Sequence, residues 1–162
     1  MKKIYVAAII IVLVATGGVA LSELNRSETP QPGSATTSAV DAKAITIYRD
    51  PNCGCCDTYA DYLEQNGYRV TRVDDRNFDK RSIAAGVPEQ GLGCHLAEVD
   101  GYVVSGLVPV EIIERLVSER PQITGITLPG MPANAPGMAR EKSGTLKTYA
   151  FGEGGVSVYS NE

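Results

Sequence analysis

The sequence predicts an α/β domain whose elements follow the order strand, helix, strand, helix, strand, strand, helix. Three patterns predict it: a strand–helix–strand pattern in residues 44–74, an Asp-Gly turn between two β-rich runs, and a later helix with apolar residues at helical spacing. A chain of 162 residues, 43% hydrophobic and 21% charged, is long enough for one such domain with appendages.

The N-terminus has the pattern of an export segment. Lys2 and Lys3 precede residues 4–22, which carry no charge. Residues 1–22 are therefore predicted to be either a cleaved signal peptide or a retained membrane anchor, and both alternatives stay open because the apolar run approaches the length of a bilayer span. Both place the folded part outside the cytoplasm, and attached to the inner membrane if the segment is retained.

Residues 23–43 are rich in Pro, Gly, Ser and Thr and have no apolar periodicity. This composition is typical of a flexible linker. The folded domain is then expected over residues 44–162.

The first half of this domain is predicted as a strand–helix–strand unit. Residues 44–48 alternate like a strand, and Asp50-Pro51-Asn52 ends it. A helix follows up to the stop signal at Asn66-Gly67, and residues 68–73 form the next strand. Such a unit favours parallel pairing of its two strands.

The second half begins with a short helix over residues 79–85. Asp100-Gly101 then predicts a hairpin, with Cys94 and His95 at the start of its first strand. A helix over residues 110–117 comes next. The remainder is expected to be a Pro/Gly/Met loop over residues 128–138 and a terminal hairpin over residues 146–151 and 156–159.

Three of the four cysteines, Cys53, Cys55 and Cys56, lie within four residues at the predicted helix start. Backbone N–H groups and the helix dipole favour thiolates there, which raises both reactivity and metal affinity. A disulfide plus a free thiol is the alternative, although a Cys53–Cys56 bond would close only a small loop. Metal ligation, redox chemistry or both are therefore indicated.

The order of elements, with Cys-x-x-Cys at a helix start, resembles thioredoxin-like folds. Gly93-Cys94 occupies the stretch where such folds place a special proline facing the cysteines, so the two cysteine motifs are expected to meet in space. Together with Cys53-Gly54-Cys55-Cys56 and the Pro-Gly-Met loop, Gly93-Cys94-His95 resembles a bacterial family of exported metal-binding proteins that includes CopG-type copper-resistance proteins.

The resemblance implies a thioredoxin-like periplasmic domain that binds copper through the Cys-x-Cys-Cys residues, Cys94 and His95. Met131 is expected as a further thioether ligand, although either Met131 or Met138 could instead simply pack under the loop, and the role of Met138 stays open. This soft donor set favours Cu(I) and could hold more than one ion. The expected function is copper resistance or homeostasis, with cycling between Cu(I) and Cu(II) left open.

The alternative function is thiol–disulfide exchange, with Cys53 as the attacking thiolate and Cys56 as the resolving one. Expected partners are copper ions and other exported copper-handling proteins. Nucleic acid is excluded as a partner, because the formal net charge is −4.

Overall fold

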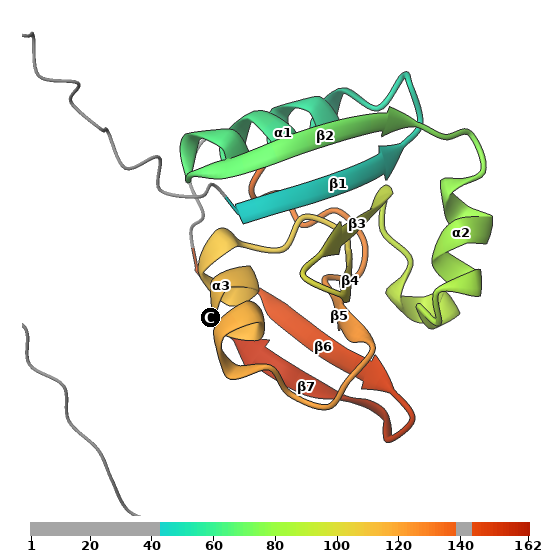
Figure 1. Cartoon of the computed structure of the whole chain (residues 1–162), viewed down its shortest axis with the longest axis vertical. Coiled ribbons are helices and arrows are strands. Elements are labelled where there is room, and N and C mark those ends of the chain that lie inside the picture. The colour runs from blue at the N-terminus through green and yellow to red at the C-terminus, as the bar shows by residue number, and fades with distance from the viewer. Residues whose placement is uncertain (1–42, 139–143) are drawn as a thin grey trace, which may run out of the picture. The chain divides into compact units, whose positions relative to one another are not determined.

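A computed structural model describes residues 43–138 and 144–162 of the chain. Its seven strands form one mixed sheet in the order β2-β1-β3-β4-β5-β6-β7 (Figure 1). The strands are β1 (Lys43–Arg49), β2 (Tyr68–Asp74), β3 (His95–Val99), β4 (Tyr102–Ser105), β5 (Gly125–Thr127), β6 (Lys147–Gly152) and β7 (Gly155–Asn161). The helices are α1 (Gly54–Gln65), α2 (Phe78–Ala84), α3 (Val110–Glu119) and the short 3₁₀ helix η1 (Glu89–Gly91).

The predicted strand–helix–strand unit is confirmed. β1 and β2 pair in parallel from Lys43 opposite Tyr68 to Arg49 opposite Asp74, and α1 connects them. The helix ends at the predicted stop, where Gly67 has a positive φ of 88°. Glycine takes this conformation without the steric cost that a Cβ adds.

The predicted hairpins are also present. β3 and β4 are antiparallel, and the turn between them uses positive φ values at Asp100 (47°) and Gly101 (86°), as a primed two-residue turn requires. β6 and β7 form the terminal hairpin. β5 was not predicted: its three residues pair with β4 in parallel and with β6 antiparallel, and so connect the two parts of the sheet.

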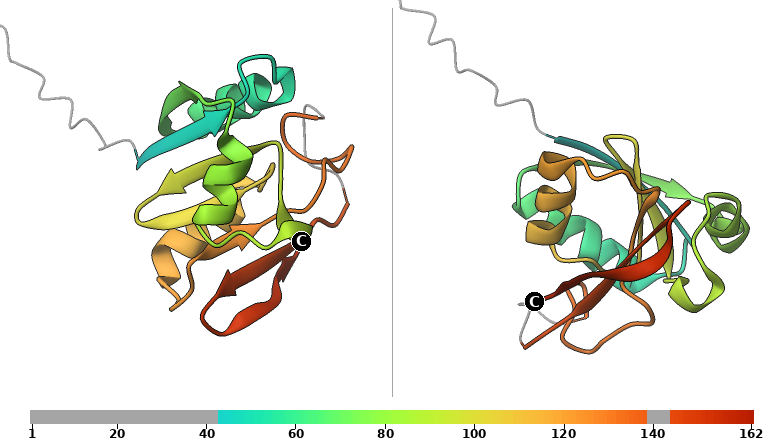
Figure 2. Two further views of the ribbon diagram at one scale, coloured as in Figure 1. Left: turned by 90° about the vertical axis from the view of Figure 1, so that its right-hand side faces the viewer. Right: turned by 90° about the horizontal axis from the view of Figure 1, so that it is seen from below.

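Helices cover both faces of the sheet (Figure 2). α1 and α3 pack their apolar residues against one face in the main core, which includes Tyr59, Leu63, Ile113 and Leu116. Val87, Leu96 and Phe151 form a smaller cluster on the side of α2. One face of α1 is buried. The N-terminal turn of this helix, which carries three cysteines, follows the end of β1 that pairs with the start of β3.

The predicted export segment, residues 1–22, lies outside the described residues, and so does the linker apart from Lys43, which begins β1. Within the described part of the chain, no helix is both long enough and apolar enough to cross a membrane.

Candidate metal centre

The four cysteine sulfurs meet at one end of the sheet. β1 leads into the cysteine turn, and β3 begins beside that end of β1 because the two strands are antiparallel, with Arg49 opposite His95. Cys53 is the N-cap residue of α1, and Cys94 lies in the bend before β3. All four sulfur atoms lie within 4.8 Å of one another, which confirms that the two cysteine motifs converge.

The four sulfurs form a closed ring of neighbours. Cys53 and Cys56 are joined by a disulfide, while Cys55 and Cys94 are free thiols. The Sγ–Sγ distances are 3.4 Å from Cys53 to Cys55, 3.7 Å from Cys55 to Cys94, and 3.6 Å from Cys94 to Cys56. This is the state that the disulfide alternative described, in spite of the small loop that the bond closes.

These separations suit a soft metal ion. Thiolates that bind one ion at about 2.3 Å lie about 3.8 Å apart in tetrahedral geometry and about 4.0 Å apart in trigonal geometry. The three non-bonded neighbours in the ring are within a few tenths of an ångström of those values. The donor set therefore fits copper, with all four sulfurs available once the Cys53–Cys56 disulfide is reduced.

Gly93 explains how Cys94 comes so close to α1. A Cβ on Gly93 would lie 2.5 Å from the backbone of Gly106, so only glycine fits between these segments. The Gly93 N–H donates to the Ser105 hydroxyl (3.1 Å), which holds this stretch against the end of β4. Neighbouring side chains of a regular strand point to opposite faces of the sheet. The bend before His95 interrupts that alternation, so Cys94 and His95 can face one site.

His95 is completely buried beside the sulfurs. Its Nδ1 lies 3.5 Å from the Cys94 sulfur, and its ring packs 5.0 Å from the Tyr59 ring between centroids. Burial lowers its pKa to about 4, so the imidazole is neutral at pH 7. Its Nε2 has no hydrogen-bond partner among the described residues. A neutral imidazole keeps a lone pair that can bind metal.

Cys94 is held as a thiol in the metal-free protein. Burial raises its pKa to about 12, and the neighbouring Cys55 adds to the rise. Cys94 lies in the bend before β3, outside α1. A metal that binds Cys94 must therefore displace a proton from its sulfur.

Arg49 fixes the cysteine turn, a role that the sequence analysis missed. Its largely buried guanidinium pairs with Asp57 in the first turn of α1 (3.0 Å) and Asp74 at the end of β2 (3.4 Å), and donates to the Asp50 carbonyl (3.0 Å). One side chain thereby connects β1, α1 and β2 beside the sulfurs. A basic residue followed by a turn carries no local pattern that would reveal this.

The Pro/Gly/Met loop contacts the cysteine turn at Gly137. A Cβ there would lie 2.8 Å from the Cys55 carbonyl oxygen and 3.0 Å from Cβ of Tyr59. Met138 follows immediately and is 44% exposed, whereas Met131 is 54% exposed. The loop therefore lies over part of the site, and ligation by Met131 stays a prediction.

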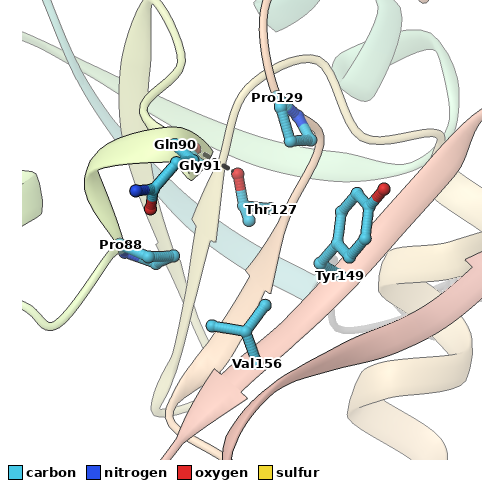
Figure 3. A pocket seen from close by; sticks show the side chains of 7 residues that line it. All are labelled: Pro88, Gln90, Gly91, Thr127, Pro129, Tyr149 and Val156. Atoms are coloured by element: carbon cyan, nitrogen blue, oxygen red, sulfur yellow. Dashed lines mark hydrogen bonds between the residues drawn. The ribbon is translucent and has the colours of Figure 1, made fainter.

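A separate pocket lies away from the sulfurs. It has a volume of about 370 Å³ and is lined by apolar and uncharged residues, Pro88, Gln90, Gly91, Thr127, Pro129, Tyr149 and Val156 (Figure 3). Thr127 donates a hydrogen bond from its hydroxyl to the Gly91 carbonyl, so this hydroxyl already has a partner within the protein. With no cysteine, histidine or carboxylate in its lining, this pocket offers no metal site.

Comparisons with known proteins match one family model and two solved structures of copper-resistance proteins to this chain. A family model described as "Protein of unknown function, DUF411" matches residues 92–138, which hold Cys94, His95 and the Pro/Gly/Met loop. The solved structure "Copper resistance protein copG- Form 2" is 33% identical, with a TM-score of 0.69, and the match covers 75% of this chain and 99% of that chain. The "Form 1" structure of the same title is also 33% identical, with a TM-score of 0.68, and the match covers 75% of this chain and 98% of that chain. No curated protein matches.

Proposed function

This chain belongs to the CopG-type family of copper-resistance proteins, and on that premise we propose that it binds Cu(I) through Cys53, Cys55, Cys56 and Cys94. The observation that carries the proposal is the cluster of four sulfurs within 4.8 Å of one another. Thiolates are soft ligands that select Cu(I) over hard cations. Four of them can bridge more than one ion, and the function we propose for this binding is copper resistance or homeostasis.

His95 and Met131 complete the proposed ligand set. Nδ1 of His95 lies 3.5 Å from the Cys94 sulfur, so one ion can contact both atoms. Met131 belongs to the loop that contacts the cysteine turn, and its thioether would cap the site. Met131→Leu is expected to weaken Cu(I) binding, and Met138→Leu is the matched control in the same loop. Equal effects of the two substitutions would assign no ligand role to Met131.

The anaerobic copper-loading experiment tests the central proposal. The protein is fully reduced, freed of metal and titrated with Cu(I) against a coloured Cu(I) chelator. At least about one copper per chain is expected to resist the chelator, and Cys94→Ser is expected to release it at least tenfold more readily because the ring loses one sulfur. Retention of less than one copper per chain by the wild-type protein would refute the proposal.

The Cys53–Cys56 disulfide favours a second function, thiol–disulfide exchange. Cys53 is partly exposed at the helix N-terminus and Cys56 is buried behind it, as an attacking and a resolving thiol would be. An insulin-reduction assay on the same preparation separates the two functions. Reduction of insulin without copper retention would favour exchange, and copper retention without reduction would favour binding.

We also propose that the domain has a thioredoxin-like fold and works in the periplasm, either released by signal cleavage or tethered by residues 1–22. Its expected partners there are other exported copper-handling proteins. Fractionation of cells that express the full chain tests the location, and intact mass measurement of the recovered protein tests whether residues 1–22 are cleaved. A periplasmic protein that lacks about its first twenty residues indicates cleavage, and a cytoplasmic protein would contradict the proposed location.

A further inference from the structure

β7 is an outer strand of the sheet, and its outer side is open. Among the residues that the structure describes, β7 pairs only with β6 (Figure 1). Residues 155–158 are all exposed, and they include Val156 at 58% and Val158 at 57%. An exposed apolar edge strand of this kind can pair with a strand of another chain.

The two outer strands of the sheet differ in charge. β2 carries three charged side chains, Arg69, Arg72 and Asp74. β7 has seven residues with no charged side chain and no proline, and its irregular pairing with β6 lies beyond Val158. Charged side chains, prolines and bulges are the usual protection of an edge strand against pairing. β2 has such protection, and residues 155–158 of β7 lack it.

The backbone of β7 has hydrogen-bonding groups on its outer side. Phe151 lies opposite Val156 in the β6–β7 ladder, and its carbonyl accepts a hydrogen bond from the Thr124 N–H (2.9 Å), on the other side of β6. Phe151 and Val156 are therefore a non-hydrogen-bonded pair, and the N–H and C=O of Val156 point away from β6. Val158 has the same direction, because the direction of these groups alternates along a strand.

We propose that β7 pairs antiparallel with β7 of a second copy of this chain, about a twofold axis at Ser157. Val156 then lies opposite Val158 of the second copy, and Val158 lies opposite Val156 of the second copy. Each of these pairs exchanges two N–H···O=C bonds, because the outward backbone groups of both residues meet. The contact is the same on both copies, so it closes as a dimer with one continuous sheet.

The valine side chains extend the apolar surface around the pocket of Figure 3. Val156 lines that pocket together with Tyr149. Val158 is opposite Tyr149 in the β6–β7 ladder and therefore lies on the same face of the sheet. In the dimer, Val158 of the second copy packs beside Val156 at the rim of the pocket. Both exposed valines of each copy lose contact with water, which stabilises the pairing.

Charge favours a second copy as the partner. Pairing about Ser157 brings no like charges together along β7, since the strand has no charged side chain. The same register places Glu153 of the second copy opposite Asn161, whose neighbour on β6 is Lys147. Glu153 and Lys147 are both exposed, and two strand spacings, roughly 10 Å between Cα atoms, separate them in the dimer. These long side chains can therefore form an ion pair at each end of the interface.

Sedimentation equilibrium of the purified, reduced protein over a concentration series tests the pairing without reference to copper. The wild-type protein is expected to approach twice the mass of one chain. Val158→Lys is expected to raise the Kd of the dimer at least about tenfold, because the ammonium group would have to leave water beside an apolar strand. Ile83→Lys is the matched control, since Ile83 is 51% exposed but lies on α2, and it should leave the Kd unchanged.

Ser157→Cys tests the register. Residue 157 of the two copies forms a non-hydrogen-bonded pair on the axis, with Cα atoms about 4.5 Å apart, a separation that a disulfide accepts. Mild oxidation is expected to join the two introduced thiols, as identified by peptide mass mapping. Ser118→Cys, at an exposed position of α3, is the control that should give no such link.

The wild-type mass and the cross-link decide the matter even if Val158→Lys fails to fold. A wild-type protein that stays monomeric up to about 1 mM would overturn the inference. A dimer whose Kd is equal in wild type and a folded Val158→Lys variant would also overturn it, as would a Ser157→Cys protein that cross-links no more than Ser118→Cys.

Discussion

Gly93 is the residue on which the position of Cys94 depends. Its Cα faces the backbone of Gly106 so closely that an added Cβ would lie 2.5 Å away from it. Two backbone segments can approach in this way only where a side chain is missing. The close approach allows the bend before β3 to direct the Cys94 sulfur toward α1.

We predict that Gly93→Ala lowers the free energy of unfolding by about 2 kcal/mol, because the new Cβ must push the segment before β3 away from the backbone of Gly106, which follows β4. It should also weaken Cu(I) binding, since Cys94 moves away from the other sulfurs. Urea denaturation and chelator competition measure the two effects. Gly54→Ala is the control: a Cβ there has no heavy atom within 4 Å, and the helix should gain up to about 1 kcal/mol. Equal effects of the two substitutions would contradict this role of Gly93.

Tyr68 should make the stability of the folded protein decrease at alkaline pH. Its side chain is buried, its hydroxyl has no hydrogen-bond partner among the described residues, and burial with the nearby Glu114 raises its pKa from 10.0 to about 12. Between these two pH values the unfolded chain loses the phenol proton while the folded protein keeps it. Stability must therefore fall as the pH rises from about 10 to about 12.

Tyr68→Phe removes this contribution. The variant should match the wild-type protein near pH 7 and exceed its free energy of unfolding by about 2 to 3 kcal/mol at pH 12. Denaturation curves of both proteins at several pH values between 7 and 12 measure the difference. A constant difference over that range would show that the Tyr68 phenol does not titrate differently on folding.

At the scale of elements, α1 is held in place by two tyrosine hydroxyls. Tyr59 donates to the Val108 carbonyl (2.7 Å), and Tyr62 accepts from the Val110 N–H (2.9 Å) at the start of α3. The helix that carries the cysteine turn is thus fixed to the segment before the next helix on the same face of the sheet.

Tyr59→Phe should lower the free energy of unfolding by about 1 to 3 kcal/mol, because the buried Val108 carbonyl loses its hydrogen bond. Tyr48→Phe is the matched control, since the Tyr48 hydroxyl makes a 3.3 Å contact with exposed Glu98 and should cost less than about 0.5 kcal/mol. Thermal or urea denaturation measures both. A cost for Tyr59→Phe no larger than for Tyr48→Phe would refute the proposed fixing of α1.

The order of elements could be predicted because its signals are local. Asn66-Gly67 ends α1, Asp100-Gly101 makes the β3–β4 turn, and Pro109 precedes α3. β5 could not be predicted in this way, since its three residues become a strand only by pairing with β4 and β6. The role of Arg49 depends on contacts among β1, α1 and β2, which are brought together only by folding, so no local sequence pattern predicts it.

At the scale of the whole molecule, the site results from joining two distant parts of the chain. The helix start after β1 supplies three cysteines, and the antiparallel pairing of β1 with β3 brings Cys94 to them. The sequence indicated this meeting through the order of elements. The Cys-x-x-Cys spacing also indicated that Cys53 and Cys56 are the pair that can be bonded. It did not decide between that disulfide and metal ligation by all four cysteines, because all four sulfurs are near neighbours.

The redox state of the disulfide should therefore set the copper capacity of the whole protein. Oxidised protein, with the Cys53–Cys56 bond intact, has two free thiols near the site, and reduced protein has four. We expect the oxidised form to retain at most about half as much Cu(I) against a chelator as the reduced form. Parallel metal analysis of the two forms measures this, and equal capacities would mean that Cys53 and Cys56 do not bind copper.

X-ray absorption at the copper K-edge of the reduced, Cu(I)-loaded protein tests the central claim most directly. Copper held by the four cysteines should show a first shell dominated by sulfur at about 2.3 Å. A first shell made only of nitrogen and oxygen atoms at about 2.0 Å would contradict the cysteine site.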